Sequence, residues 1–77
     1  MKRITYSKRA SKYINKQNYK IKLAIKNAIE NIPKGDIKYF KSDNVWRLRI
    51  GNLRILYYRD GDNIHVDDIG SRGDIYK

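Results

Sequence analysis

The spacing of apolar residues changes partway along the chain, and this change limits the folds it can adopt. Between residues 18 and 32, apolar side chains recur at i, i+3, i+4 and i+7, the spacing of an amphipathic helix. From Val45 the period changes to two, with Trp46, Leu48 and Ile50 alternating with Val45, Arg47 and Arg49, which is typical of a half-buried strand. Helical segments followed by successive strands predict an α+β domain, with the helices on one face of a sheet.

The first part of the chain is predicted to hold one short strand and two helices. Residues 3–6 alternate between polar and apolar side chains, as a strand does. Ser7 is placed to cap a helix that runs to about residue 17, and Asn18 is placed to cap a second helix. Pro33-Lys34-Gly35 ends that helix, because proline cannot continue it and glycine favours a turn.

The second part is predicted to be an antiparallel meander. Residues 36–44 are expected to form a connector that ends in a turn. Gly51-Asn52 is a two-residue turn with glycine where type II′ requires it, and Asp60-Gly61 is predicted to be a second turn, of type I′ character. The expected order is therefore β-α-α-β-β-β, in one domain over residues 1–77 with a largely antiparallel sheet.

The two turns predict a register that sorts the strand side chains onto two faces. Gly51-Asn52 places Arg49 opposite Arg54, and Asp60-Gly61 would place Asp67 opposite Arg54 as its ion-pair partner. One face collects the expected core: Trp46, Leu48, Ile50, Leu53, Ile55, Tyr57, Ile64 and Val66. The opposite face collects Arg47, Arg49, Arg54, Leu56, His65 and Asp67, with His65 expected opposite Leu56.

Three arginines on one sheet face indicate a ligand. Like charges directly opposite each other on neighbouring strands destabilise a sheet by a few tenths to roughly 1 kcal/mol. A guanidinium group binds phosphate through paired hydrogen bonds, so an anion-binding surface accounts for the arrangement. A solvated face with Arg54 paired to Asp67 is the alternative. Leu56 and nearby tyrosines could add stacking surface for bases.

Composition narrows the class of protein. Eighteen Lys and Arg against 8 Asp and Glu give a net charge of +10, which predicts a polyanionic partner, either nucleic acid or an acidic protein. The absence of cysteine excludes disulfides and thiolate chemistry, and with a single histidine no metal or other cofactor is expected. Neither a membrane-spanning segment nor a signal peptide is predicted, so the expected location is the cytoplasm.

Two segments resemble the RelE toxins. Residues 46–57 are similar to their aromatic-Arg-Leu-Arg-Val-Gly-x-x-Arg-Ile-x-Tyr hairpin, and residues 69–77 to their closing Ile-x-x-Arg-x-x-Val-Tyr segment. The resemblance covers essentially the whole chain and implies a microbial RNase fold and a type II toxin–antitoxin role. It also implies three partners, namely an antitoxin protein, the ribosome and mRNA.

The resemblance further implies a reaction and the residues that carry it. RelE-type toxins enter the ribosomal A site, where the 2′-OH of the mRNA attacks the adjacent phosphate. No metal is needed. The implied catalytic positions are Arg47, Arg49, Arg54, Arg72 and Tyr76. Contacts to RNA are expected from Arg47, Arg49 and Lys41.

Roles for these residues follow from the charge of a phosphorane transition state. Arg54 and Arg72 are expected to stabilise the phosphoryl oxygens, with Arg47 and Arg49 on the RNA backbone and the leaving-group side. Arginine stays protonated, and family members often carry lysine where this chain has Arg47 and Arg49. Tyr76 is therefore the first candidate for proton transfer.

Other interpretations of these candidates stay open. His65 is the second candidate for proton transfer, because its ordinary pKa suits acid–base work. Arg72 and Tyr76 could fold back over the arginine face, or Ile75 and Tyr76 could instead close an edge of the core. For the whole chain, the alternatives are a ParE-like toxin that inhibits DNA gyrase and a non-catalytic RNA-binding protein or decayed toxin.

Overall fold

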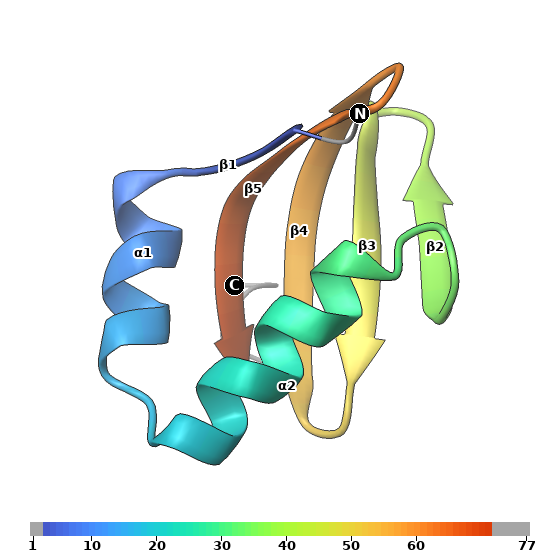
Figure 1. Ribbon diagram of the computed structural model, residues 1–77. Helices are drawn as coiled ribbons and strands as arrows, with labels where there is room; N and C mark the ends of the chain where they lie inside the picture. Colours follow the sequence, from blue (N-terminus) through green and yellow to red (C-terminus); the bar gives the residue numbers. More distant parts are fainter. Residues whose placement is uncertain (1–2, 72–77) are drawn as a thin grey trace.

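Two helices cover one face of a five-stranded sheet (Figure 1). The computed structural model describes residues 3–71. The elements are β1 (Arg3–Tyr6), α1 (Lys8–Asn15), α2 (Tyr19–Glu30), β2 (Asp36–Phe40), β3 (Val45–Ile50), β4 (Leu53–Asp60) and β5 (Asn63–Ser71). The strand order is β1-β5-β4-β3-β2, with β1 parallel to β5 and the other pairs antiparallel. The predicted α+β class, with both helices on one face, is confirmed.

Both helices begin at the predicted capping residues. The Ser7 hydroxyl accepts a hydrogen bond from the Ala10 amide at 3.0 Å, and the Asn18 side-chain oxygen accepts one from the Ile21 amide at 3.0 Å. These caps satisfy amide groups that have no partner inside the helix. No helix in the described part of the chain is long and apolar enough to cross a membrane.

One expected connector is a strand. Within residues 36–44, the stretch Asp36–Phe40 forms the edge strand β2, which pairs with β3 from Asp36 opposite Arg49 to Phe40 opposite Val45. The expected turn follows this strand, with Asn44 at a φ of 52°. The Tyr39 hydroxyl donates to the Asn44 side-chain oxygen at 2.8 Å and braces the turn. Tyr39 also lies against Trp46, with ring centroids 4.5 Å apart.

The register of the first hairpin is as predicted. Ile50 lies opposite Leu53, and Arg49 lies opposite Arg54. Gly51 has a φ of 54°, which satisfies the positive angle that the first position of a type II′ turn requires. The side chains predicted to form the core therefore point toward the helices.

The register predicted for the second hairpin is wrong. The turn is Gly61-Asp62, with Asp60 opposite Asn63, so glycine again takes the first turn position, at a φ of 60°. A turn at Asp60-Gly61 of type I′ would have required positive φ at Asp60 as well, which glycine tolerates far better than aspartate. The whole of β5 is displaced relative to the expected pairing.

This displacement changes the neighbours of two candidate residues. His65 lies opposite Tyr58 rather than Leu56, and Arg54 lies opposite Gly70 rather than Asp67. Asp67 is the extra residue of a β-bulge, at the register shift between Leu56 and Tyr57. A bulge bends its strand, and the start of α1 is attached here through the Ser7 amide, which donates to the Val66 carbonyl at 2.8 Å.

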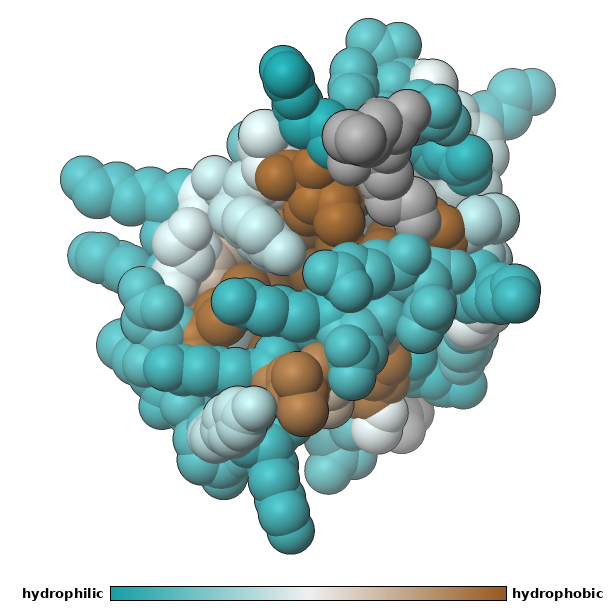
Figure 2. Space-filling view, in the orientation of Figure 1, coloured by the Kyte–Doolittle hydropathy of each residue, from teal (hydrophilic) through white to brown (hydrophobic). Residues whose placement is uncertain are grey.

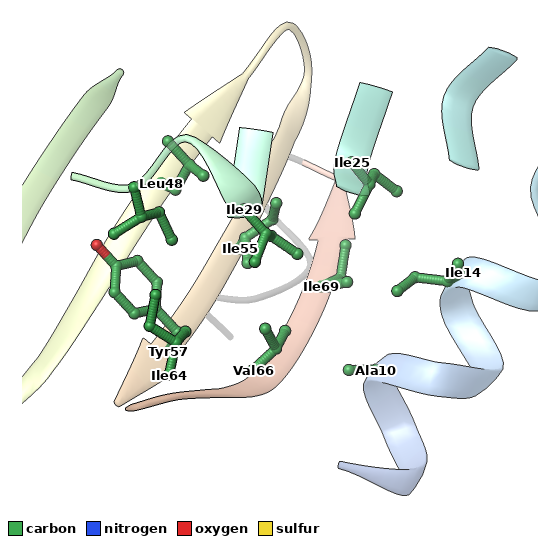
Figure 3. Close-up of a cluster of buried hydrophobic side chains, with 11 residues drawn as sticks. Ala10, Ile14, Ile25, Ile29, Leu48, Ile55, Tyr57, Ile64, Val66 and Ile69 are labelled. Atoms are coloured by element: carbon green, nitrogen blue, oxygen red, sulfur yellow. The ribbon is translucent and has the colours of Figure 1, made fainter. Parts of the chain in front are cut away.

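The core lies between the helices and the sheet (Figure 3). Ile25 and Ile29 of α2, with Ala10 and Ile14 of α1, face strand side chains. The strand members of this core are Leu48, Ile55, Tyr57, Ile64, Val66 and Ile69. On the outside, the helix-covered side is mostly hydrophilic, with smaller hydrophobic patches between the polar side chains (Figure 2). Burial raises the pKa of Tyr57 and of Tyr6, with Glu30 adding to the effect at Tyr6.

Candidate functional site

The candidate site lies on the sheet face turned away from the helices, here called the outer face. Arg47, Arg49 and Arg54 alternate with core residues on β3 and β4 and form what we call the arginine cluster. Arg49 and Arg54 lie directly opposite each other on neighbouring strands. Arg54 is only 7% exposed, whereas a guanidinium group on a simple solvated face would extend into water.

A single carboxylate holds two members of the cluster. Both the Nε and an Nη2 of Arg49 contact Asp36 Oδ2, at 2.7 and 2.6 Å. Arg47 Nη2 lies 3.6 Å from the other carboxylate oxygen, Oδ1. Asp36 reaches these partners because it begins β2 directly opposite Arg49. This carboxylate therefore fixes the direction of two guanidinium groups.

The cluster keeps an excess of positive charge and an open space beside it. Three arginines and Asp36 leave two net positive charges. A hollow of about 70 Å³ is lined by Arg49, Arg54 and the backbone turn at Gly51 and Asn52. Arg47 Nε is buried without a hydrogen-bond partner among residues 3–71. Guanidinium donors around a small polar hollow suit a phosphate group.

The acidic residues of β5 do not serve the cluster as expected. The predicted Arg54–Asp67 pair is wrong, since Arg54 lies opposite Gly70 and Asp67 sits in the bulge. The Ser7 hydroxyl donates to the Asp67 backbone carbonyl at 2.5 Å. Asp68 contacts Arg9 of α1 at 3.3 Å. Asp67 and Asp68 thus help to attach α1 to the sheet, Asp67 through its backbone and Asp68 through its carboxylate.

His65 and Lys41 lie away from the cluster. His65 is on the outer face, and its Nδ1 is 2.8 Å from the hydroxyl of Thr5. Its cross-strand neighbour Tyr58 is four residues along β4 from Arg54, which corresponds to roughly 13 Å at the usual rise per residue. Lys41 is exposed in the turn after β2, at the same end of the sheet as Tyr58. Neither residue is brought to the arginine hollow.

Two further candidates, Arg72 and Tyr76, lie outside the described residues. The last described residue, Ser71, is opposite Leu53, next to Arg54. The chain therefore leaves β5 at the arginine end of the outer face. Within residues 3–71, no three His, Asp or Glu side chains come together as a metal-binding group.

Comparison with known proteins identifies the family. The sequence model described as "ParE toxin of type II toxin-antitoxin system, parDE" matches residues 4–76. No curated protein sequence matches the chain. The fold and this match define a toxin of type II toxin–antitoxin systems. The chain belongs to the ParE toxin family, within the RelE/ParE superfamily.

Several solved structures share this fold, and one of them is more than 30% identical to the chain. A chain of the RelB–RelE antitoxin–toxin complex from Methanococcus jannaschii is 31% identical, with a TM-score of 0.74 and 94% of each chain covered. A chain of the YoeB–YefM complex from Staphylococcus aureus has a TM-score of 0.73 at 22% identity, covering 94% of this chain and 98% of its own. A chain of the intact E. coli RelBE complex has a TM-score of 0.67 at 13% identity, covering 92% and 96%.

Asp36 is the site residue that the sequence reasoning missed. Its signal was the alternation of Asp36-Ile37-Lys38-Tyr39, which is that of a strand with its apolar residues inward. A strand here, joined to β3 by the turn at residues 41–44, would have placed Asp36 beside Arg49. The sequence-based prediction places Asp36 in a connector, where it has no role.

Proposed function

We propose that this chain is a ribosome-dependent endoribonuclease, the toxin of a type II pair that cuts mRNA in the ribosomal A site. The observation that carries the proposal is the pairing of Arg49 with a buried Arg54 across β3 and β4, beside a hollow that suits one phosphate.

The proposed reaction is transesterification within the RNA. The 2′-hydroxyl gives up its proton to a general base as its oxygen bonds to phosphorus, the bond from phosphorus to the 5′-oxygen breaks, and the leaving oxygen takes up a proton. The products are a 2′,3′-cyclic phosphate and a 5′-hydroxyl. Negative charge grows on the phosphoryl oxygens, and prearranged guanidinium groups stabilise it. We assign this role to Arg54 and Arg72, as expected from the sequence, and add Arg49 because it lies opposite Arg54 beside the hollow. Arg47 is assigned to the neighbouring RNA backbone.

Proton transfer is assigned to a residue outside the arginine cluster, because arginine stays protonated near neutral pH. Tyr76 is the candidate for this step. The chain leaves β5 next to Arg54, so the segment that carries Tyr76 starts at the correct end of the face. His65 is not given this role, because it lies opposite Tyr58, which is roughly 13 Å along β4 from Arg54.

The proposal includes three partners. An antitoxin is supported by the toxin–antitoxin complexes among the structural neighbours. The excess of basic residues suits an acidic antitoxin segment that folds on binding, as well as the ribosome and mRNA. Action on ribosomes would place the protein in the cytoplasm.

Primer extension on a defined mRNA tests the proposal, with purified protein and with or without programmed ribosomes. We expect cuts at the A-site codon only when ribosomes are present. Cuts that do not depend on ribosomes would contradict A-site action, and the absence of cuts from folded, toxic protein would contradict the nuclease assignment.

Inhibition of DNA gyrase is the second candidate function, because the matching family model is that of ParE toxins. The phosphate-sized arginine hollow favours the nuclease, since gyrase inhibition needs no such constellation. A supercoiling assay with purified gyrase separates the two. Inhibition of supercoiling by the wild type and equally by Arg54→Ala, without mRNA cuts, would favour the gyrase function.

A further inference from the structure

A second hollow lies on the outer face, at the end opposite the arginine cluster. Its volume is about 220 Å³, and it spans β1, β5 and β4. Two register rows line it. One row is Thr5, His65 and Tyr58, and the other is Arg3, Asn63 and Asp60. We call this space the His65 hollow. None of its residues has a part in the reaction proposed above.

The side chains of the first row are arranged to hold a flat ring. The hydroxyl of Thr5 contacts His65 Nδ1 at 2.8 Å, which fixes the imidazole and leaves Nε2 as the ring nitrogen that can meet a ligand. Tyr58 lies opposite His65 and is 42% exposed, a large fraction for an aromatic side chain with no described ring partner. Any of the four bases can stack on such a ring, because every base has a flat aromatic face.

The second row adds charge and polar groups. Among residues 3–71 Arg3 forms no salt bridge, so its guanidinium is available to an anion. Asn63 supplies an amide with both donor and acceptor atoms. Asp60 is the one carboxylate among the lining residues, and Arg59 adds a second guanidinium. The lining therefore has net positive charge beside an apolar, aromatic wall.

We propose that the His65 hollow binds one nucleotide of the single-stranded RNA, with its base on Tyr58 and its phosphate at Arg3. Pockets for drug-sized ligands measure about 300–1,000 Å³, so this smaller space suits a ligand no larger than one nucleotide. This inference rests on the proposed nuclease function. Tyr58 lies roughly 13 Å along β4 from Arg54, so a strand held at the cluster can reach the hollow within a few nucleotides.

The first test is a titration of labelled protein with adenosine 5′-monophosphate, followed by two-dimensional NMR. We expect shifts at the residues of the His65 hollow. Tyr58→Ala should weaken the binding there by about 5- to 150-fold, the range that base–aromatic stacking gives. Tyr58→Phe should bind like the wild type because it keeps the ring. Tyr19→Ala is the matched control, since Tyr19 is 70% exposed on α2, on the other side of the sheet.

Three results of this titration would overturn the proposal. Shifts confined to the arginine hollow would show that the His65 hollow takes no nucleotide. Inorganic phosphate binding as tightly as the nucleotide, at the same residues, would show an anion site without base recognition. Equal binding by Tyr58→Ala and the wild type would remove the stacking role.

The second test asks whether the nucleotide belongs to the RNA substrate. On programmed ribosomes, Tyr58→Ala should raise the toxin concentration for half-maximal cleavage while the maximal rate stays unchanged. An unchanged half-maximal concentration, despite weaker binding of the free nucleotide, would contradict an RNA subsite. The absence of cleavage by the wild type would instead contradict the proposed function, which the NMR titration does not test.

Discussion

Asp36→Asn tests whether Asp36 serves the proposed site by holding the guanidinium groups of Arg49 and Arg47 in place or only through its negative charge. The wild-type carboxylate contacts Arg49 at 2.6 Å and Arg47 at 3.6 Å. Asparagine keeps the size of the side chain but removes its negative charge. Arg49 would stay opposite Arg54, but its guanidinium would be held less firmly in one orientation. The cluster would also gain one net positive charge.

The effect on stability should be small. Asp36 and Arg49 have side chains 48% and 47% exposed, and ion pairs at such positions contribute about 0–1 kcal/mol because water and salt screen them. The melting temperature should fall by no more than about 4–8 °C for a domain of this size. A domain with about 5 kcal/mol or more of stability stays almost fully folded after that loss.

Asp36→Asn should lower the maximal cleavage rate by more than its small loss of stability can explain. If Arg49 adopts its working direction a tenth of the time, the maximal rate falls about tenfold, equivalent to about 1.4 kcal/mol. The toxin concentration for half-maximal cleavage should not rise, because removing a carboxylate strengthens attraction to RNA. Unfolding of the variant would instead lower the fraction of active protein, and so raise the toxin concentration needed for half-maximal cleavage.

Cleavage of ribosome-bound mRNA at several toxin concentrations gives the maximal rate and the toxin concentration for half-maximal cleavage. Urea unfolding gives the stability of each variant. Asp43→Asn is the matched control, since it makes the same charge change in the exposed turn between β2 and β3. We expect Asp43→Asn to keep the wild-type maximal rate. The reasoning would be refuted if Asp36→Asn also kept it, or if both variants lost rate equally.

Three further predictions concern the site, the charge and the core. Arg54→Ala and Arg72→Ala should each abolish toxicity in growth assays while circular dichroism stays that of a folded protein; growth arrest by both variants would reject their assignment. Binding to ribosomes should weaken steeply with salt, as counterion release requires, and a flat response would argue against a phosphate-tracking face. Burial raises the pKa of Tyr57 above 10.0, so its contribution to stability should be complete below pH 10 and decline as pH rises through the folded-state value. Urea midpoints should therefore fall above pH 10, and by less in Tyr57→Phe; an equal fall in both would contradict this.

Local signals predicted the helices and the first hairpin. Ser7 and Asn18 cap the helices because their side-chain oxygens can accept from nearby amides, which depends only on adjacent residues. The register of β3 and β4 followed from Gly51 at the first position of a two-residue turn. The predicted placement of Arg49 opposite Arg54 depended on this register and is confirmed.

The second hairpin shows where the prediction failed. Gly61 takes the same first position as Gly51, so the rule that placed the first turn would also have placed the second. The bulge at Asp67 was a separate matter, because an extra residue in one strand depends on how β5 meets β4 and α1 together. With the turn at Gly61-Asp62, a β5 strand without the bulge would place Ile69 opposite Arg54, and the bulge places Gly70 there instead.

Asp36 and the His65 hollow could be found only from the tertiary structure. Asp36 meets the arginines only once β2 lies on β3, and a short edge strand has weak local signals. The His65 hollow joins residues 3–5 to residues 58–65 through the parallel pairing of β1 with β5. Such contacts between distant segments leave no fixed spacing in the sequence.

The most direct test of the central claim is cleavage of an mRNA that carries a single 2′-deoxynucleotide on the 5′ side of the expected cut, on programmed ribosomes. The attacking oxygen is then missing, while the phosphate and every other group stay in place. We expect cleavage at that position to stop, and the unmodified mRNA to give a 2′,3′-cyclic or 3′-phosphate end and a 5′-hydroxyl end. Cleavage of the deoxy-substituted mRNA at the unmodified rate would contradict the proposed chemistry of the arginine cluster.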